Sequence, residues 1–390
     1  ASLNLSKWDK LKEYTNLIAI DNDDTKYQIN FYNAVISIQE DKYNEAKKFI
    51  IEAKSEIDSK IKLLVSESYA RGYELLLKNE IMYQLEEIIS YKQNKITKED
   101  MVNTWDRRLQ YINKDPSIFE RALAIRSLVL NINEDYENYL ELAKICRKNN
   151  QFDTCFKVLE RIRKKLNPSE KNNEIIIKIE LSKNKCLFEE GNENEAITNA
   201  NKIISEYNIS DISDKIKSKV YGSYAYFSIK NLALNPENEE SLKSILKYLE
   251  LSTKYNSKNY KSWHSYALLN YQFFEILSNM NNGNYLTYAL NAVIGFTDSI
   301  CIGGKNISKI LQDLLRLLDL WFTIGSIGEL QKHLSNSFEV IDIDSFLLVI
   351  PQLLARIDIN DKVIFEMLHN LLLKIGNAHP RALIYPLIVM

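Results

Sequence analysis

One segment of the chain combines residue types that could bind phosphate, Cys301-Ile302-Gly303-Gly304-Lys305-Asn306. A phosphate-binding loop needs the spacing GxxxxGK[ST] between a strand and a helix, so that backbone N–H groups converge on the phosphates. This segment lacks that spacing, and no strand-like pattern precedes it. We therefore interpret it as a turn between two helices.

The other residues suited to chemistry are scattered. The 4 cysteines and 4 histidines form no CxxC pair and no Cys/His spacing typical of zinc sites. We expect the cysteines to be buried free thiols in a reducing compartment: Cys146, Cys155, Cys186 and Cys301. His264 follows Trp263 on a predicted packed face, so we expect a core or interface residue, not a metal ligand. Protein-kinase motifs such as His-Arg-Asp and Asp-Phe-Gly are absent, so this chain is not expected to transfer phosphate.

Basic residues cluster at two neighbouring places, Arg161–Lys165 and Arg147-Lys148. Cations favour the C-terminal ends of helices, where they complement the helix dipole, and such clusters are usually solvated. An anion site remains the alternative if the two clusters face the same groove.

Composition excludes several classes of function. The chain has 390 residues, a formal net charge of −2, 45% hydrophobic and 26% charged residues. These values fit a folded protein with two or three cores, and no basic field indicates nucleic acid or an acidic membrane. An RNA-binding helical repeat is disfavoured for the same reason. We find no signal peptide and no apolar stretch near the roughly 20 residues that a membrane helix needs, which predicts a cytosolic or nuclear protein.

The elements that position these residues are predicted to be helices. Only 10 Gly and 6 Pro interrupt a sequence rich in Leu, Ile, Lys and Glu. A tetratricopeptide unit pairs two antiparallel helices with small residues at their crossing, about every 34 residues. Residues 33–53 fit this pattern, with Ala34 and Ile38 on one helix and Ala46, Ile50 and Ala53 on the next. Further matches in the same frame are Trp8–Tyr14; Ala143 and Cys146 with Cys155, Leu159 and Ile162; Leu187 with Ala196, Ala200 and Ile203 around Gly191; and Trp263, Tyr266 and Ala267.

The repeat changes after a polar, breaker-rich segment at residues 278–284. Beyond it, Leu311–Phe322 and Val363–Ile375 read as longer Leu-rich helices, interrupted at Pro351, which suits HEAT-like pairs of about 40–47 residues. The sequence therefore predicts an all-α helical-repeat solenoid, with tetratricopeptide-like pairs in residues 1–278 and HEAT-like helices in residues 287–390.

The sequence motifs near the C-terminus resemble those of a known protein family. Ile350–Ile357, reading Ile-Pro-Gln-Leu-Leu-Ala-Arg-Ile, is followed by His379-Pro380 and by Ala382–Leu387. This series closely resembles the end of the FAT region of the TOR (target of rapamycin) protein kinases. Further matches in family order include Trp8-Asp9, Glu67–Arg71, Leu85–Lys92, Trp105, Arg126–Val129, Tyr260–His264, Gly295-Phe296 and Leu320–Phe322. The resemblance spans nearly the whole chain and is weakest between about residues 167 and 259.

The resemblance implies a non-catalytic regulatory and scaffolding segment that clamps the kinase domain of its own polypeptide in nutrient and growth signalling. It implies TOR complex subunits (Raptor-like or Rictor-like) and a second TOR protomer as partners of the parent protein. It also implies a cytoplasmic location, with the nucleus and the endomembrane surface left open. The chain begins with Ala1 and stops at Met390 within an apolar run, so we expect it to be a piece of a longer kinase whose catalytic domain lies elsewhere.

The resemblance further implies a structural ligand, inositol hexakisphosphate, held by basic side chains. The family lysine of a Cys-Gly-Lys turn falls on Lys148 in Cys146-Arg147-Lys148. A second family lysine falls on Lys185, ahead of Phe188, and a family arginine falls on Ser223. Lys219, one helical turn before Ser223, is the residue that could replace that arginine. A free-standing tetratricopeptide/HEAT adaptor that binds partner proteins is the alternative function.

Overall fold

Every regular element in the described part of the chain is a helix, as the sequence predicts. The computed structural model describes residues 8–18, 23–166, 173–206, 212–231, 239–279, 285–304 and 307–389. The chain divides into two compact units, residues 1–168 and residues 169–390, and each is described by itself. The predicted all-α, helical-repeat fold is confirmed.

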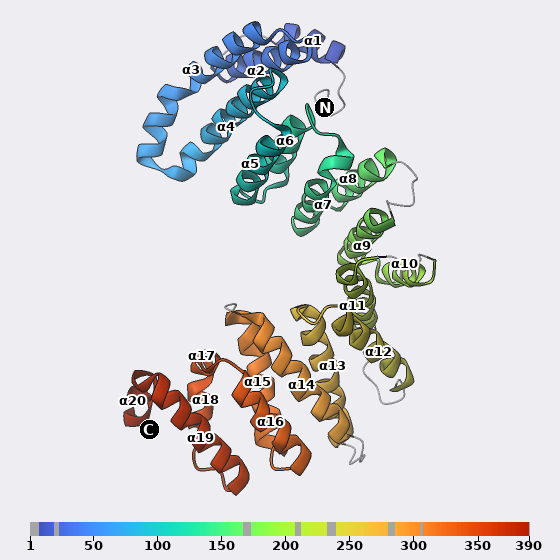
Figure 1. Cartoon of the computed structure of the whole chain (residues 1–390), viewed down its shortest axis with the longest axis vertical. Coiled ribbons are helices and arrows are strands. Elements are labelled where there is room, and N and C mark those ends of the chain that lie inside the picture. Colours follow the sequence, from blue (N-terminus) through green and yellow to red (C-terminus); the bar gives the residue numbers. More distant parts are fainter. Residues whose placement is uncertain are drawn as a thin grey trace. The chain divides into compact units, whose positions relative to one another are not determined.

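The N-terminal unit is a series of helices that pack against their neighbours in sequence (Figure 1). Its helices are α1 (Trp8–Leu17), α2 (Asp23–Gln39), α3 (Tyr43–Glu67), α4 (Tyr69–Lys92), α5 (Lys98–Tyr111), α6 (Pro116–Arg126), α7 (Ile132–Lys148) and α8 (Phe152–Lys165). Helices α3 and α4 are the longest, with 25 and 24 residues against 14 for α5 and 11 for α6. Helix α4 packs against α3 and also contacts α2, α5 and α6.

The crossing of α2 and α3 forms as the small-residue pattern predicts. Ala34 and Ile38 on α2, and Ala46 and Ile50 on α3, are all fully buried. Asp41 makes the turn between the two helices with φ of 58°, in the left-handed region. The small side chains of Ala34 and Ala46 let the two helix backbones approach closely at the crossing.

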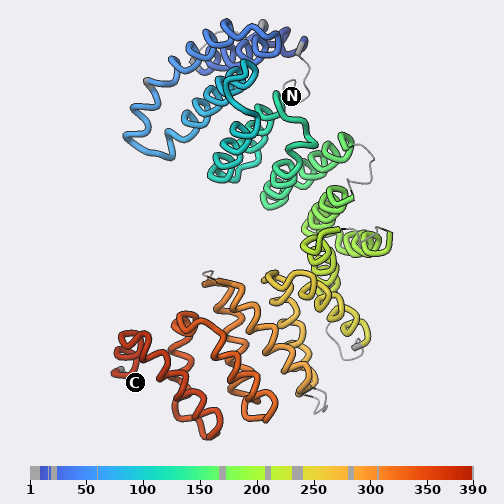
Figure 2. Tube along the Cα trace, viewed as in Figure 1, coloured from blue at the N-terminus to red at the C-terminus, as the bar shows by residue number. Residues whose placement is uncertain are grey.

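The C-terminal unit repeats this arrangement of helices that pack against their neighbours in sequence. They are α9 (Asn173–Glu190), α10 (Glu193–Glu206), α11 (Asp214–Asn231), α12 (Glu239–Tyr255), α13 (Tyr260–Asn279), α14 (Tyr285–Gly303), α15 (Ile307–Ile324), α16 (Gly328–Val340), α17 (Ile343–Phe346), the 3-10 turn Leu347–Val349, α18 (Ile350–Leu354), α19 (Lys362–Ala378) and α20 (Pro380–Val389). Within this unit the chain turns back at each connection from α13 to α16 (Figure 2). Gly191, with φ of 104°, makes the predicted turn between α9 and α10.

The predicted change of repeat type falls between α13 and α14. Residues 280–284 of the predicted linker lie outside the described residues. The helices on either side pack together, and one hydrophobic core runs from Ala225 to Leu383. The division into residues 1–278 and 287–390 stays a prediction.

Helix α14 corrects one expectation from the sequence. It has 19 residues and is apolar enough to cross a membrane by length and composition, although no such stretch was expected. Its buried residues, among them Ala292, Val293 and Phe296, belong to the hydrophobic core of the C-terminal unit. It packs between α13 and α15.

Candidate anion site and buried charge centres

The first predicted cation, Lys148, lies exposed in the last turn of α7 beside Arg147. The neighbouring basic cluster, Arg163–Lys165, forms the last turn of α8. Both groups occupy C-terminal helix ends, where positive charge complements the helix dipole. Lys164 also pairs with Glu160 at 3.3 Å. These contacts agree with the interpretation as solvated helix ends, and an anion site at this place stays a prediction.

The other two predicted cations lie in the C-terminal unit. Lys185 is half-buried on α9, and Lys219 is exposed on α11, which contacts α9. Each side chain already has an interaction within the chain. Ser223, at the position of the family arginine, lies one turn after Lys219 on the same helix face. Lys185 and Lys219 thus lie on contacting helices, whereas Lys148 belongs to the other unit.

An aromatic contact holds α9 against α11 near these lysines. Phe188, three residues after Lys185, stacks on Phe227 with ring centroids 4.7 Å apart. Tyr226 adds a second ring at 5.8 Å from Phe188. Because residues three apart share a helix face, this stack sets the position of Lys185 relative to α11.

A fully buried carboxylate, Asp313 on α15, is the polar centre of the C-terminal unit, and the sequence analysis missed it. Its oxygens accept hydrogen bonds from Ser299 Oγ on α14 at 2.7 Å and from the Tyr260 hydroxyl on α13 at 3.2 Å. His264 Nδ1 on α13 is 2.7 Å from the same carboxylate, and Arg316 Nη1 is 4.0 Å away. The centre joins three helices, and it confirms His264 as a bonded residue at a helix interface.

Ser, His and Asp also form hydrolase triads, but the order of contacts here is different. In a triad the histidine lies between the nucleophile and the carboxylate and accepts the serine proton. Here Ser299 donates directly to Asp313, so the carboxylate is central. Burial and the negative charge of Asp313 raise the pKa of Tyr260 above its usual 10.0, which keeps that hydroxyl a donor. The arrangement is suited to holding helices together, not to catalysis.

The N-terminal unit has its own buried charge, Arg126 at the end of α6, which is 2% exposed. Its guanidinium donates to both carboxylate oxygens of Asp135 at 2.9 and 2.7 Å, and to Asp106 at 2.7 Å. Trp105 lies beside it, with the ring centroid 5.8 Å from the guanidinium carbon. Burial by itself lowers the pKa of Arg126, but the two carboxylates outweigh burial and raise it. Among the described residues, its Nη1 atom has no hydrogen-bond partner.

Two sequence motifs of the resemblance contact each other in the C-terminal unit. The Trp321 ring is fully buried, stacks on Phe322 at 4.8 Å and meets the edge of Phe338 at 4.5 Å. Arg356, from the Ile-Pro-Gln-Leu-Leu-Ala-Arg-Ile segment, lies over Phe322 with 5.2 Å to the ring centroid. A Cβ atom at Gly325 would collide with the backbone oxygen of Trp321, so this position must be glycine. The motif residues therefore form one packed unit.

The cysteine prediction is right for three residues and wrong for the fourth. Cys146, Cys155 and Cys186 are buried free thiols. Cys301, in the last turn of α14, is exposed, and its Sγ lies 3.9 Å from the backbone oxygen of Val340 on α16. Gly304, with φ of 59°, begins the predicted turn after this helix, while Lys305 and Asn306 lie outside the described residues. Within the described ranges, no group of three or more His, Cys, Asp or Glu side chains is placed to hold a metal ion.

Comparison with known proteins gives a family for this fold. The FAT domain family model matches residues 2–319. The chain is 29% identical to serine/threonine-protein kinase TOR of Arabidopsis thaliana, 28% identical to mTor of Drosophila melanogaster and 28% identical to TOR2 of Saccharomyces cerevisiae. These alignments cover 100% of this chain but only 17% of the first two kinases and 18% of the third.

Two solved structures share the fold. The open conformation of CtTel1 superposes with a TM-score of 0.69 at 13% identity, covering 97% of this chain and 16% of that one. The FAT and kinase domain of CtTel1 gives 0.68 at 14% identity, covering 97% and 30%. The family model covers most of the chain and the TOR kinases align with all of it, so the resemblance seen in the C-terminal motifs is confirmed. The chain belongs to the FAT domain family, and its relatives over its whole length are TOR kinases.

Proposed function

We propose that this chain is a non-catalytic regulatory and scaffolding segment of a TOR-type serine/threonine protein kinase in nutrient and growth signalling. Two observations support the proposal together: the match to the FAT domain family model, and the alignment of the whole of this chain with TOR kinases. A kinase domain of the same polypeptide is the proposed partner that the segment clamps. The solved FAT and kinase domain of CtTel1, which shares the fold, supports this choice of partner.

An exposed apolar face on α20 gives the proposal a physical basis. Ile384, Tyr385 and Ile388 are 54%, 74% and 77% exposed, and Leu387 is also exposed. Exposed apolar side chains that lie together usually mark an interaction surface. We infer that this face packs on the kinase domain.

The test expresses the chain and the kinase domain of its parent gene as separate polypeptides and measures their association by pull-down. Ile384→Glu/Ile388→Glu is expected to weaken capture by about tenfold or more, because two charges would have to be buried. The control, Asn370→Glu/Asn377→Glu, adds the same charge at exposed positions of α19 and is expected to bind normally. Equal capture by both variants would contradict the proposal. A parent gene without a kinase domain would favour the adaptor alternative.

Membership of the FAT family also underlies our proposals for the repeat types, the partner proteins and the location. We propose tetratricopeptide-like pairs before residue 278 and HEAT-like helices after residue 287, supported by the buried small residues at the α2–α3 crossing. We also propose Raptor-like or Rictor-like subunits and a second TOR protomer as partners, and a cytoplasmic location. Mass spectrometry of the tagged parent protein purified from cytosol and from membranes tests the partners and the location together.

We further propose inositol hexakisphosphate as a structural ligand. The support is the pair Lys185 and Lys219 on contacting helices, held by the aromatic stack beside Lys185. A polyanion needs several converging cations, because a single exposed pair contributes little. Calorimetric titration should show weaker binding in Lys148→Ala/Lys185→Ala and no change in Lys202→Ala, an exposed lysine on α10.

A substitution at Ser223 tests the site by an expected increase in affinity. Ser223→Arg restores the family cation one turn after Lys219 and is expected to tighten binding of inositol hexakisphosphate by roughly tenfold. Unchanged affinity in this variant and in the lysine double variant would refute the site.

A further inference from the structure

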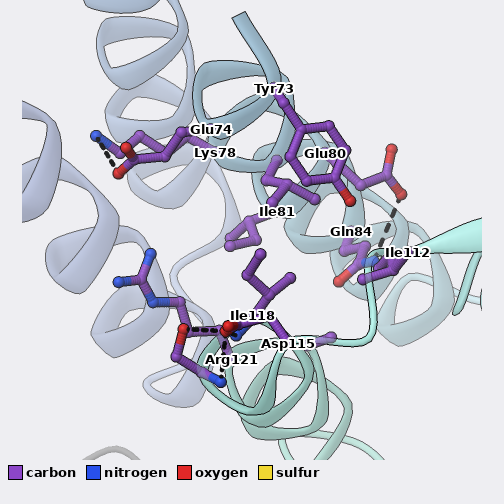
Figure 3. Close-up of a pocket in the computed structure, with 13 residues that line it drawn as sticks. Tyr73, Glu74, Lys78, Glu80, Ile81, Gln84, Ile112, Asp115, Ile118 and Arg121 are labelled. Carbon is purple, nitrogen blue, oxygen red and sulfur yellow. Dashed lines mark hydrogen bonds and ion pairs between the residues drawn. The ribbon is translucent and has the colours of Figure 1, made fainter. Parts of the chain in front are cut away.

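A pocket of about 350 Å³ lies inside the N-terminal unit, between α4 and the segment formed by the α5–α6 connection and the first turns of α6 (Figure 3). Its walls are fixed by hydrogen bonds. The Tyr73 hydroxyl oxygen on α4 accepts from the backbone N–H of Asn113 at 2.9 Å, which ties α4 to the connection. The Tyr27 hydroxyl on α2 donates to the backbone oxygen of Lys78 at 2.9 Å and fixes α4 from its other side.

The middle of the pocket is aliphatic. Ile81 on α4 and Ile118 on α6 point toward each other across it (Figure 3). Leu77, Ile112 and Ala122 complete this apolar lining. The volume is near the lower end for ligand pockets, which span roughly 300–1,000 Å³. It therefore suits one aliphatic side chain with the backbone that carries it.

A buried acceptor without a partner lines the same pocket. Gln84 is 5% exposed, and among the described residues its Oε1 atom has no hydrogen-bond partner. Its Nε2 atom faces Glu80 Oε1 at 3.4 Å, so the carboxylate fixes which end of the amide donates. A buried acceptor without a donor is unfavourable. A ligand N–H group would satisfy it.

Most charged groups of the lining are already paired. Lys78 contacts Asp24 at 3.1 Å and Glu74 at 3.6 Å, and Glu80 pairs with Arg108 at 2.9 Å.

The last carboxylate of the lining, Asp115, caps α6 by accepting from the backbone N–H groups of Ser117 and Ile118 at 2.9 and 3.2 Å. Arg121 is different, since no carboxylate oxygen of a described residue lies within ion-pair distance of its guanidinium, although its charge contributes to the lowered pKa of Asp115. Arg121 is thus the cation of the lining that can pair with one carboxylate of a ligand. A polyphosphate would meet three carboxylates and is disfavoured.

We propose that this pocket binds a short peptide segment of a partner protein. An aliphatic side chain lies between Ile81 and Ile118, a backbone N–H donates to Gln84 Oε1, and an acidic side chain pairs with Arg121. A peptide supplies all three groups within two or three residues. The site lies wholly in the N-terminal unit, so it does not depend on how the C-terminal unit meets a kinase domain.

The experiment screens a positional-scanning library of N-acetylated hexapeptide amides against the whole chain, with affinity measured by fluorescence polarisation. The wild type is expected to select an aliphatic residue next to, or one residue away from, Asp or Glu. Arg121→Glu is expected to reverse the charge preference from acidic to basic, because it replaces the pairing cation by an anion. Arg121 is exposed, so the substitution is expected to have little effect on folding. Lys144→Glu, an exposed change on α7, serves as the control and should keep the acidic preference.

Gln84→Leu separates binding from folding. This variant removes the unpaired acceptor, so it is expected to unfold at the same or a higher temperature while binding the selected peptide roughly tenfold more weakly. An unchanged charge preference in Arg121→Glu would overturn the proposal. So would selection of basic peptides by the wild type, or competition by inorganic phosphate as effective as that by the peptide.

Discussion

The two units bury a charge in different ways. In the N-terminal unit, Arg126 is compensated by two opposite charges, Asp135 and Asp106, which it contacts directly. In the C-terminal unit, Asp313 is surrounded mainly by hydrogen-bond donors, and the nearest Arg316 atom is 4.0 Å away. The first centre is an ion-pair network, while the second is a carboxylate held by hydroxyl and imidazole groups.

The two centres also differ in what they connect. The partners of Arg126 lie 9 and 20 residues away, so this centre fixes the junction of α5, α6 and α7. The partners of Asp313 lie 14, 49 and 53 residues away and tie α15 to α13 and α14. Buried polar groups of both kinds favour one arrangement of helices, because any other packing leaves them unpaired.

Replacement of the arginine is expected to have the largest effect on stability. Arg126→Met leaves Asp135, which is 4% exposed, buried without its cation. Breaking a buried pair in this way costs about 3–5 kcal/mol in the free energy of unfolding. Urea denaturation followed by tryptophan fluorescence, in a background where Trp263 and Trp321 are replaced by Phe, would measure the loss in the N-terminal unit.

A double variant checks the cause of that loss. Arg126→Met/Asp135→Leu removes both charges and is expected to recover much of the stability, because apolar residues often replace a buried pair at little cost. If the double variant is as unstable as the single one, the loss of stability comes mainly from disturbed packing around Trp105 and not from the uncompensated carboxylate.

The carboxylate centre should be less sensitive to loss of its charge. Asp313→Asn keeps the shape and one acceptor oxygen but weakens hydrogen bonds that involve a charged group, with an expected cost of about 1–3 kcal/mol. Asp319→Asn on the same helix is the matched control, since the exposed Asp319 side chain accepts a hydrogen bond from the Tyr271 hydroxyl at 2.7 Å. Near-UV circular dichroism during thermal unfolding would follow both variants. An equal loss of stability in the two variants would contradict the expectation that the buried hydrogen bonds of Asp313 stabilise the unit more than an exposed one does.

The sequence was sufficient for the helix pairs because their signal is local. Ala34, Ala46 and Ile50 show the crossing by their spacing alone, and all three are fully buried. His264 could be assigned to the core or to a helix interface for the same reason, since it follows Trp263 on a packed face, and it lies half-buried at such an interface. Cys301 was predicted wrongly, because the sequence does not show which side of a helix end meets the core.

The buried centres could not be predicted because they depend on distant contacts. Asp313 carries a weak signal, an acidic residue within the apolar stripe that includes Ile310 and Leu317, but its partners become visible only when α13 and α14 are placed. Arg126 shows no pattern that separates it from a solvated helix end. The joint role of Lys148 and Lys185 stays a prediction because the two residues belong to different units.

Each unit also has an acidic helix cap that is sensitive to pH. Hydrogen bonds from the Ser117 side chain and the Ile118 N–H hold the pKa of Asp115, at the start of α6, below its ordinary 3.8. The Ile364 N–H chiefly does the same for Asp361 at the start of α19 and holds its pKa below 3.8. Both carboxylates satisfy backbone N–H groups that the helix itself leaves unpaired.

The smallest expected effect is therefore loss of the two cap charges in acid. A pKa lowered by folding means that the contribution to stability is complete above pH 3.8 and disappears as the pH falls through the lower, folded-state pKa. Asp115→Asn and Asp361→Asn keep a capping side chain, so each should lower the Tm only slightly at pH 7, and the difference from wild type should shrink as the pH falls below 3.8. Glu366→Gln, exposed on α19, is the control for general charge effects. A Tm difference that stays constant from pH 7 to pH 2 would show that the caps act through shape and not through charge.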